Sequence, residues 1–200
     1  MQAQKASTPQ LKWSTIAPAT RYETIVSPSI QLKPGDIADI PNGSLRIPNF
    51  DNPYVEEFTE RAKTFSYYYL LRRDTKDQQD ISRAFNIYVN HVIKYDDSWY
   101  RYRTGDVFGV EEIIQNKAGV CKDQSAVLYM MLRREDMDAY YCAISSLDAN
   151  QGHTFIKIKI NNEDYLADPT SNIFGEYGST FDLEYKRKFV STFLLIRRPL

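Results

Sequence analysis

The sequence predicts an α+β fold, in which helices fill the first part of the main domain and an antiparallel β-sheet fills the second. Between about residues 53 and 134, apolar side chains recur three or four positions apart, which is the spacing of helices. From Ala139 onward they alternate with polar residues, which is the spacing of strands. Helices first and strands second is an α+β arrangement. A chain of 200 residues suits one domain, with or without an appended arm.

Prolines crowd the first quarter of the chain, and no long helix or strand fits among them. Only short apolar stretches, such as residues 22–26 and 44–47, can form strands there. We therefore expect a flexible tail or linker over residues 1–20 and an extended arm over residues 21–52. The main domain would then span residues 53–200.

The first helices are predicted by their start signals and by their apolar spacing. Asn52 and Pro53 form a typical helix start, because Asn caps a first turn and proline is tolerated in it. This helix is expected to extend over about residues 53–72. A second one runs from about residue 75 or 77 to 94, and a short third one covers residues 110–116.

The fourth helix follows Cys121 and is expected to form the buried centre of the domain. Its residues 126–132 are apolar almost all round, which is typical of a helix that is covered on every side. Arg133 and Arg134 lie in its last turn, where cations suit the helix dipole.

Four strands are expected after this helix, over residues 139–145, 153–160, 165–167 and 189–196. Asn161 and Asn162 predict a two-residue type I′ turn between the second and the third, because Asn tolerates positive φ. This turn sets Lys159 opposite Asp164, which is a favourable cross-strand pair of charges. The same register gives three further pairs: Ile160 with Glu163, Ile158 with Tyr165, and Ile156 with Ala167.

This register also brings His153 and Asp168 together at the other end of the hairpin. Phe155 lies opposite Asp168, so His153 is a diagonal neighbour of Asp168 on the same face. Diagonal Cβ atoms lie at most roughly 7–8 Å apart, and an imidazole hydrogen-bonded to a carboxylate spans about that distance. A slip of one residue would place the two side chains on opposite faces.

Cys121 is the candidate nucleophile that this pair would serve. It stands after Gly119, where a loop enters the fourth helix, and a helix N-terminus favours thiolate over thiol. Gly119 permits a close approach of the backbone, and an N–H group near Cys121 can hold an oxyanion. A thiol, an imidazole and a carboxylate can act as nucleophile, base and orienting group. The sequence therefore predicts Cys121, His153 and Asp168 as catalytic residues.

Each of these residues also has an ordinary structural interpretation. Taken alone, a cysteine before an apolar helix is more often a small buried hydrophobe, and Asp-Pro-Thr is a common strand end. A lone histidine at a strand start is more often a hydrogen-bonded or surface residue, but the joint geometry favours catalysis. Cys142, in the middle of a strand, is expected to be structural. We expect no metal and no cofactor, because the close ligand pairs of structural zinc sites are missing.

Taken in order, these motifs resemble the transglutaminase-like superfamily of papain-fold cysteine enzymes over roughly residues 77–170. The motifs are Ile-Lys-Tyr-Asp at residues 93–96, Gly-Val-Cys at 119–121, Leu-Arg at 132–133, the strand that His153 opens, and Asp-Pro-Thr at 168–170. The resemblance implies a papain-like α+β fold, with the cysteine helix packed on an antiparallel sheet. It also implies that Cys121, His153 and Asp168 have the roles given above, and that residues 53–200 form the catalytic domain.

Some features depart from the usual pattern of this family. Thr154 and Phe155 stand where the family often has a small residue and then Trp. Lys122 adds a positive charge beside the thiol, which favours the thiolate. An upstream aromatic side chain often helps to hold the oxyanion in this family, and Trp99 and Tyr102 are the candidates here. The extra domains of the larger calcium-dependent members are missing from this chain, so we expect no calcium requirement.

The expected function is cysteine-dependent acyl transfer on amide or peptide bonds through a thioester on Cys121. If water resolves the thioester, the enzyme is a protease, amidase or deamidase, and the diversity of small microbial members favours this hydrolysis. If a lysine or another amine resolves it, the enzyme is a protein-crosslinking transglutaminase. Two alternatives outside catalysis are an idle module that binds protein or glycan in the same groove, and a cell-wall-associated structural domain. The latter would fit the early prolines and the 15 tyrosines.

The expected partners are a protein or peptide substrate and, for crosslinking, an amine acceptor. The formal net charge of −1 gives no reason to expect binding to nucleic acid or to an anionic membrane. No apolar run approaches the roughly 18 residues that a transmembrane helix needs. No signal-peptide core follows Met1. We expect a secreted or cell-envelope protein without its leader rather than a cytoplasmic one.

Overall fold

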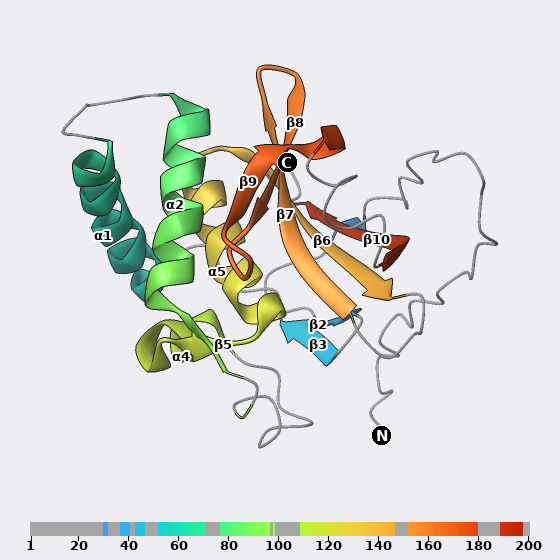
Figure 1. Cartoon of the computed structure of the whole chain (residues 1–200). Coiled ribbons are helices and arrows are strands. Elements are labelled where there is room, and N and C mark those ends of the chain that lie inside the picture. The colour runs from blue at the N-terminus through green and yellow to red at the C-terminus, as the bar shows by residue number, and fades with distance from the viewer. Residues whose placement is uncertain are drawn as a thin grey trace, which may run out of the picture.

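The helices gather on one side of the molecule and the main β-sheet on the other, as Figure 1 shows. Helix α5 (Cys121–Arg134) lies between them: it packs against the other described helices and against strands β6 (Asp138–Ser146) and β7 (Gly152–Ile160). The predicted α+β class is therefore confirmed. The computed structural model describes the backbone of residues 30–31, 37–40, 43–46, 52–70, 77–96, 98, 109–146, 152–179 and 189–197.

The described helices begin close to the predicted residues, and the first two begin at side-chain caps. They are α1 (Pro53–Tyr69), α2 (Gln78–Val92), α4 (Val110–Asn116) and α5 (Cys121–Arg134). The side chain of Asn52 accepts hydrogen bonds from the N–H groups of Tyr54 and Val55, and Asp77 caps α2 in the same way. The described helix α1 ends before the predicted residue 72, and residues 71–76 lie outside the described chain.

In the part of the chain that the structure describes, the main sheet has six strands in the order β1, β10, β6, β7, β8, β9. Their bounds are β1 (Ile30–Gln31), β6 (Asp138–Ser146), β7 (Gly152–Ile160), β8 (Glu163–Asp168), β9 (Ile173–Glu176) and β10 (Phe189–Arg197). Among the described strands of this sheet, only β1 pairs in parallel, with β10. Two small sheets join β2 (Ile37–Ile40) to β3 (Gly43–Arg46) and β4 (Lys94–Tyr95) to β5 (Ala118–Gly119).

The predicted register of the β7–β8 hairpin is confirmed. Asn161 and Asn162 form its turn with φ angles of 51° and 68°, and Ile160 pairs with Glu163. Both angles are positive, as a type I′ turn requires. Lys159 lies opposite Asp164 in the backbone register, as predicted. The structure adds an ion pair that the sequence did not predict, between Asp164 and its diagonal neighbour Lys157.

The core sits between the helices and one face of the sheet. Every residue of α5 from Cys121 to Leu132 is buried, which confirms the prediction of a central helix. Ile156 and Ile158 of β7 pack in this same core, whereas Phe155 packs with Cys142 on the other face. The side chains of β7 therefore alternate between two layers, as the strand period requires.

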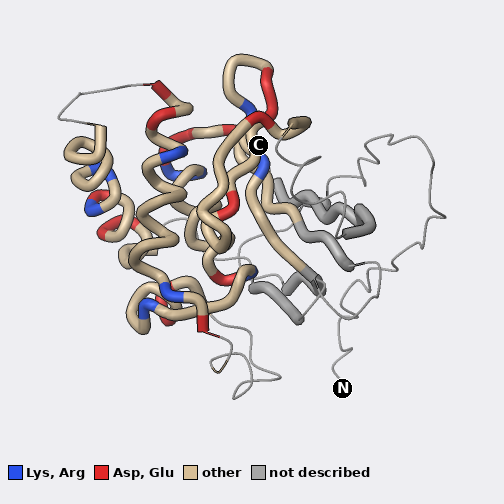
Figure 2. The backbone as a smooth tube through the Cα atoms, in the orientation of Figure 1, with Lys and Arg blue, Asp and Glu red and all other residues tan. Residues whose placement is uncertain are grey.

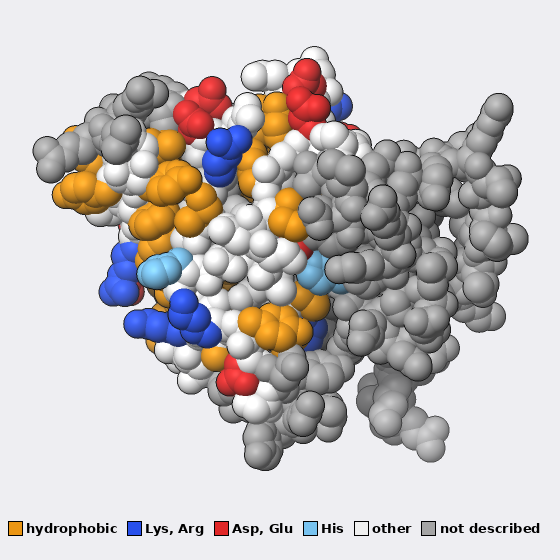
Figure 3. Space-filling model, in the orientation of Figure 1, with side chains coloured by type: hydrophobic (Ala, Val, Ile, Leu, Met, Phe, Trp, Pro, Cys, Tyr) orange, Lys and Arg blue, Asp and Glu red, His pale blue; other side chains and the backbone are white. Residues whose placement is uncertain are grey.

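The surface of the described residues carries both charged and hydrophobic side chains. Among the described residues, Lys and Arg are spread over several elements, as Figure 2 shows. Figure 3 shows hydrophobic side chains gathered on the side of the molecule that α1 and α2 form, and α1 contributes exposed tyrosines there. No helix in the described part of the chain is long and apolar enough to cross a membrane.

Strands β1, β2, β4, β5 and β9 are absent from the sequence-based prediction because each is short. Strand β9 has four residues and includes Gly175, which weakens its strand pattern. It turns back onto β8 after residues 169–172, and Asn172 has a φ of 54° in that turn. The predicted strand at residues 44–47 corresponds closely to β3, and the one at residues 22–26 lies outside the described residues.

Candidate functional site

Cys121 is the first residue of α5, as predicted, and it is buried with 8% of its surface exposed. The chain reaches it through Gly119, which pairs with Tyr95 in the small parallel sheet. A Cβ atom on Gly119 would lie 2.6 Å from the Cβ atom of Asp123, which real Cβ atoms do not tolerate. The glycine is therefore needed because the loop lies directly against the first turn of the helix.

Asp123 connects this loop to the helix. Its Oδ2 accepts a hydrogen bond of 3.0 Å from the N–H group of Val120, the residue before Cys121. This is half of a capping box, since the side chain of Val120 has no acceptor to offer in return. Its Oδ1 accepts a hydrogen bond of 2.8 Å from the ammonium group of Lys122.

Lys122 contributes less positive charge to the site than the sequence suggests. Its side chain is buried with 5% exposed, and the paired carboxylate of Asp123 has 2% exposed. A buried pair of opposite charges is close to neutral when seen from outside. The expected effect of Lys122 on the thiol is therefore largely offset by Asp123.

His153 and Asp168 meet as the hairpin register predicts. The Nε2 atom of His153 lies 2.8 Å from the Oδ2 atom of Asp168, within hydrogen-bond distance. The side chain of Asp168 is fully buried, and that of His153 is 13% exposed. The imidazole also forms a side-chain hydrogen bond with Cys121. Because Nε2 faces Asp168, the ring nitrogen that remains for the thiol is Nδ1.

Asp168 is itself held by backbone groups of the turn that follows it. Its Oδ1 accepts hydrogen bonds from the N–H groups of Thr170, at 2.9 Å, and Ser171, at 3.3 Å. Helix α2 holds the same turn, because the side-chain amide of Asn90 donates to the carbonyl oxygen of Pro169 at 2.7 Å. The carboxylate therefore faces His153 from a fixed position.

The environment of His153 favours the charged imidazolium. Burial of the ring opposes its protonation, but hydrogen bonds to Asp168 and Cys121 and the charges of both groups outweigh burial. Together they raise the pKa of His153 to about 10. A ring that is protonated at neutral pH can form an ion pair with a thiolate and can donate a proton to a leaving group.

Cys142 has the structural surroundings that its sequence position predicts. It is fully buried between Phe155 and Leu166, and both cysteines are free thiols. Burial raises the pKa of its thiol to about 12, because a thiolate would be desolvated there. Cys142 is therefore a natural internal reference for the reactivity of Cys121.

Two of the predicted site residues, Trp99 and Tyr102, lie outside the described residues. Conversely, the structure brings Asp123 and Asn90 into the site, which sequence reasoning missed. Asp123 could have been found as an acidic residue at the third position of a helix, although the usual Ser or Thr cap is missing. Asn90 gave no local signal, because its partner is 79 positions away.

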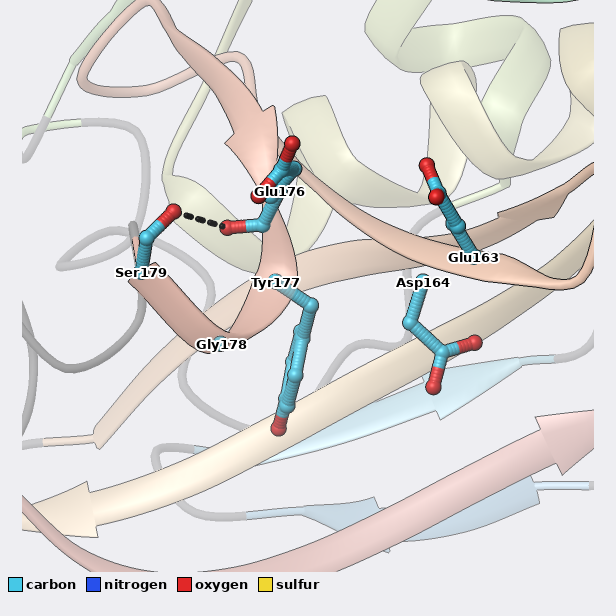
Figure 4. Close-up of a pocket in the computed structure, with 6 residues that line it drawn as sticks. All are labelled: Glu163, Asp164, Glu176, Tyr177, Gly178 and Ser179. Carbon is cyan, nitrogen blue, oxygen red and sulfur yellow. Dashed lines mark hydrogen bonds between the residues drawn. The ribbon is translucent and has the colours of Figure 1, made fainter.

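A separate cavity of about 360 Å³ lies at the other end of the β7–β8 hairpin and contains neither cysteine nor histidine. Figure 4 shows its lining, with Glu163 and Asp164 on one side and Glu176 and Tyr177 on the other. The described residues contain no group of three or more side chains that could hold a metal ion. We therefore take the Cys121 region, not this cavity, as the candidate site.

The chain is similar to known proteins both in sequence and in structure. A family described as "Transglutaminase-like domain" matches residues 66–193. No curated protein matches the chain significantly. Similar solved structures include a proposed cysteine protease from Cytophaga hutchinsonii, with 14% identity, a TM-score of 0.42, and coverage of 64% of this chain and 49% of that one.

Two further structures are similarly distant. A TGase has 13% identity and a TM-score of 0.44, with coverage of 62% of this chain and 32% of that one. Arylamine N-acetyltransferase C from Bacillus anthracis has 14% identity and a TM-score of 0.43, with coverage of 74% and 71%. The chain spans less than half the length of the first two proteins. These values give no basis for carrying an activity over to this chain.

Proposed function

Because the chain belongs to the family of transglutaminase-like domains, we propose that it is a cysteine-dependent acyl-transfer enzyme that acts on amide or peptide bonds. Cys121 would be the nucleophile, His153 the proton carrier and Asp168 the group that orients the ring. The observation that carries the proposal is that one imidazole contacts both the Cys121 thiol and the Asp168 carboxylate, the latter at 2.8 Å.

In the proposed first half-reaction, the Cys121 thiolate attacks the carbonyl carbon of the substrate. The N–H group of Cys121 is at the first position of α5, where helix N–H groups have no partner within the helix, and it would stabilise the oxyanion. The imidazolium of His153 then gives its proton to the leaving nitrogen as the C–N bond breaks. The products are an amine or ammonia and a thioester on Cys121.

In the second half-reaction, neutral His153 would accept a proton from the incoming nucleophile as it attacks the thioester. Water gives a carboxylic acid, and a lysine or another amine gives a new amide bond. Cleavage of the C–S bond restores the thiolate and imidazolium. We favour hydrolysis, which needs only water as the acceptor, and we treat crosslinking as the second candidate.

The first test is the rate at which iodoacetamide alkylates each cysteine from pH 5 to 9, measured by peptide mass spectrometry. We expect rapid labelling of Cys121 below pH 7, because its thiolate is paired with a charged ring, while Cys142 stays unlabelled in the same molecule. If Cys121 reacts no faster than an unperturbed thiol, whose pKa is about 8.5, the proposed function is wrong.

The second test separates the two acyl acceptors. Glutamine-containing peptides are incubated with and without a primary amine, and ammonia, cleaved peptide and amine adduct are quantified by mass spectrometry. Hydrolysis predicts that acid or cleaved product dominates even when amine is present. Cys121→Ala should abolish all three signals while its circular dichroism spectrum stays that of the parent. Turnover that persists in this variant would contradict a thioester mechanism.

A further inference from the structure

One phenol group connects the helix of Cys121 to the strand of His153. The Tyr141 side chain is fully buried on β6, and its hydroxyl donates a hydrogen bond of 3.0 Å to the carbonyl oxygen of Lys122. The same hydroxyl forms a side-chain hydrogen bond with Thr154. Lys122 directly follows Cys121, and Thr154 directly follows His153.

A second buried link joins the same two elements. The hydroxyl of Ser125, on α5, donates to the carbonyl oxygen of Thr154 at 3.0 Å, and the two hydroxyl oxygens lie 3.4 Å apart. Ser125 is fully buried and Thr154 is 1% exposed. Besides the apolar core between α5 and the sheet, these polar side chains link the start of the helix to β7 directly.

The length and packing of Tyr141 suit this connecting role. Thr154 on β7 lies directly opposite Ala143 on β6. Tyr141 is two positions before Ala143, on the same face of β6, so its side chain reaches Thr154 as a diagonal neighbour. Its ring packs edge-on against Tyr129, with 6.4 Å between ring centroids, which limits its movement. A phenylalanine would fill this space equally well, so the hydroxyl is present for its hydrogen bonds and not for its volume.

We propose that Tyr141 is a positioning residue, which holds the first turn of α5 at the correct distance from His153. This inference rests on the proposed function, because it concerns how the Cys121 thiol and the imidazole are kept in contact. Small displacements of reacting groups are sufficient for large losses of rate, since a shift of about 1 Å can reduce a rate on the order of 100-fold.

The test compares Tyr141→Phe with Tyr165→Phe as a matched control. Tyr165 is also a buried tyrosine of the same sheet, and its hydroxyl bonds Glu163 at 3.2 Å and Gln79 at 3.5 Å, away from the site. For each variant, the alkylation rate of Cys121 at pH 6 and the melting temperature are measured. We expect Tyr141→Phe to lower the alkylation rate about 10-fold. Tyr165→Phe should leave this rate unchanged, although its melting temperature should be similar to that of Tyr141→Phe.

A second pair of variants makes the test independent of folding effects. Thr154→Val removes the hydroxyl that Tyr141 contacts, and Thr154→Ser keeps it. We expect the valine variant to react as slowly as Tyr141→Phe and the serine variant to recover most of the rate. If both Tyr141→Phe and Thr154→Val react at the parent rate, the positioning role is refuted while the proposed function stands. If the parent Cys121 is itself unreactive, the proposed function fails first.

Discussion

Two cross-strand pairs of the β7–β8 hairpin share one backbone geometry and differ in their surroundings. His153 lies 2.8 Å from Asp168 near one end, and Lys157 lies 3.1 Å from Asp164 near the other. Both pairs are diagonal in the same sense, because each carboxylate contacts the β7 residue two positions before its direct partner. The right-handed twist of the hairpin and the reach of long side chains account for this shared direction.

The difference between the pairs lies in burial and in further partners. The side chain of Asp168 is fully buried and that of Asp164 is 42% exposed. Asp168 also accepts two backbone hydrogen bonds, and His153 has Cys121 as an additional partner. Lys157 instead lies over the rings of Tyr140 and Tyr177, at 5.2 and 5.7 Å from their centroids. The register brings both pairs into contact. Only the His153–Asp168 pair lies in a buried environment, and burial is what allows this contact to change the chemistry of the two side chains.

The largest effect on the reactivity of Cys121 is expected when the β7 member of the buried pair is removed. His153→Ala should slow the alkylation of Cys121 at pH 6 by about 100-fold or more, because the thiolate loses its charged partner and proton carrier. Lys157→Ala is the matched control, since it removes a charged residue from the same face of the same strand. Cys121 in the Lys157→Ala variant should be alkylated at the same rate as in the parent, as measured by the same peptide mass spectrometry. Equal losses in both variants would mean that the hairpin as a whole, and not the imidazole, controls the thiol.

A smaller effect is expected on stability when the two carboxylates are removed. Asp168→Ala takes away the acceptor for His153 and for two backbone N–H groups, so the free energy of unfolding should fall by about 1–3 kcal/mol. Asp164→Ala should lower it by less than about 1 kcal/mol, because exposed ion pairs contribute little. Urea unfolding at pH 7 measures both. A larger loss for Asp164→Ala would overturn the ranking of the two pairs.

The sequence was sufficient to predict the register of the β7–β8 hairpin, but not to predict which of its two cross-strand pairs matters more. The hairpin could be predicted because its signals are local: two Asn residues in the turn and alternating apolar residues on either side. The ion pair of Lys157 was missed, because a direct pairing rule selects Lys159 and ignores the twist of the strands. Burial of Asp168 depends on helix α2, whose Asn90 reaches the turn from 79 positions away.

Helix α5 shows the same difference between features that local sequence signals predict and features that they do not. Its apolar residues predicted a buried central helix, and the position of Cys121 at its start followed from Gly119. The contacts of Tyr141 with Lys122 and Thr154 were not predictable, since they depend on how α5 crosses the sheet. Local signals therefore identified which residues can meet, and the packing of elements decides how firmly they are held.

The pH dependence of stability gives a further distinction between the two ends. The pKa of His153 rises from about 6.5 in the unfolded chain to about 10 in the folded one, so its protonated form stabilises the fold. This contribution is fully present below about pH 6.5 and is lost as the pH rises through about 10. The stability difference between the parent and His153→Ala should therefore shrink between pH 6 and pH 10.5 in urea unfolding. A difference that stays constant over this range would show that the charge of the ring does not stabilise the fold.

The smallest effect is expected at the turn, on which the register of both pairs depends. Asn162 has a φ of 68°, and glycine adopts such angles without strain, so Asn162→Gly should raise the free energy of unfolding by about 0.5 kcal/mol. Asn162→Ala should lower it by about 1 kcal/mol, because a side chain with a Cβ and no local hydrogen bond is strained there. Urea unfolding measures the pair. Neither variant should change the alkylation rate of Cys121, since the buried His153 end is held independently by α2 and α5. If Asn162→Ala slows alkylation as much as a change at His153, the turn and not the packing around Asp168 maintains the site.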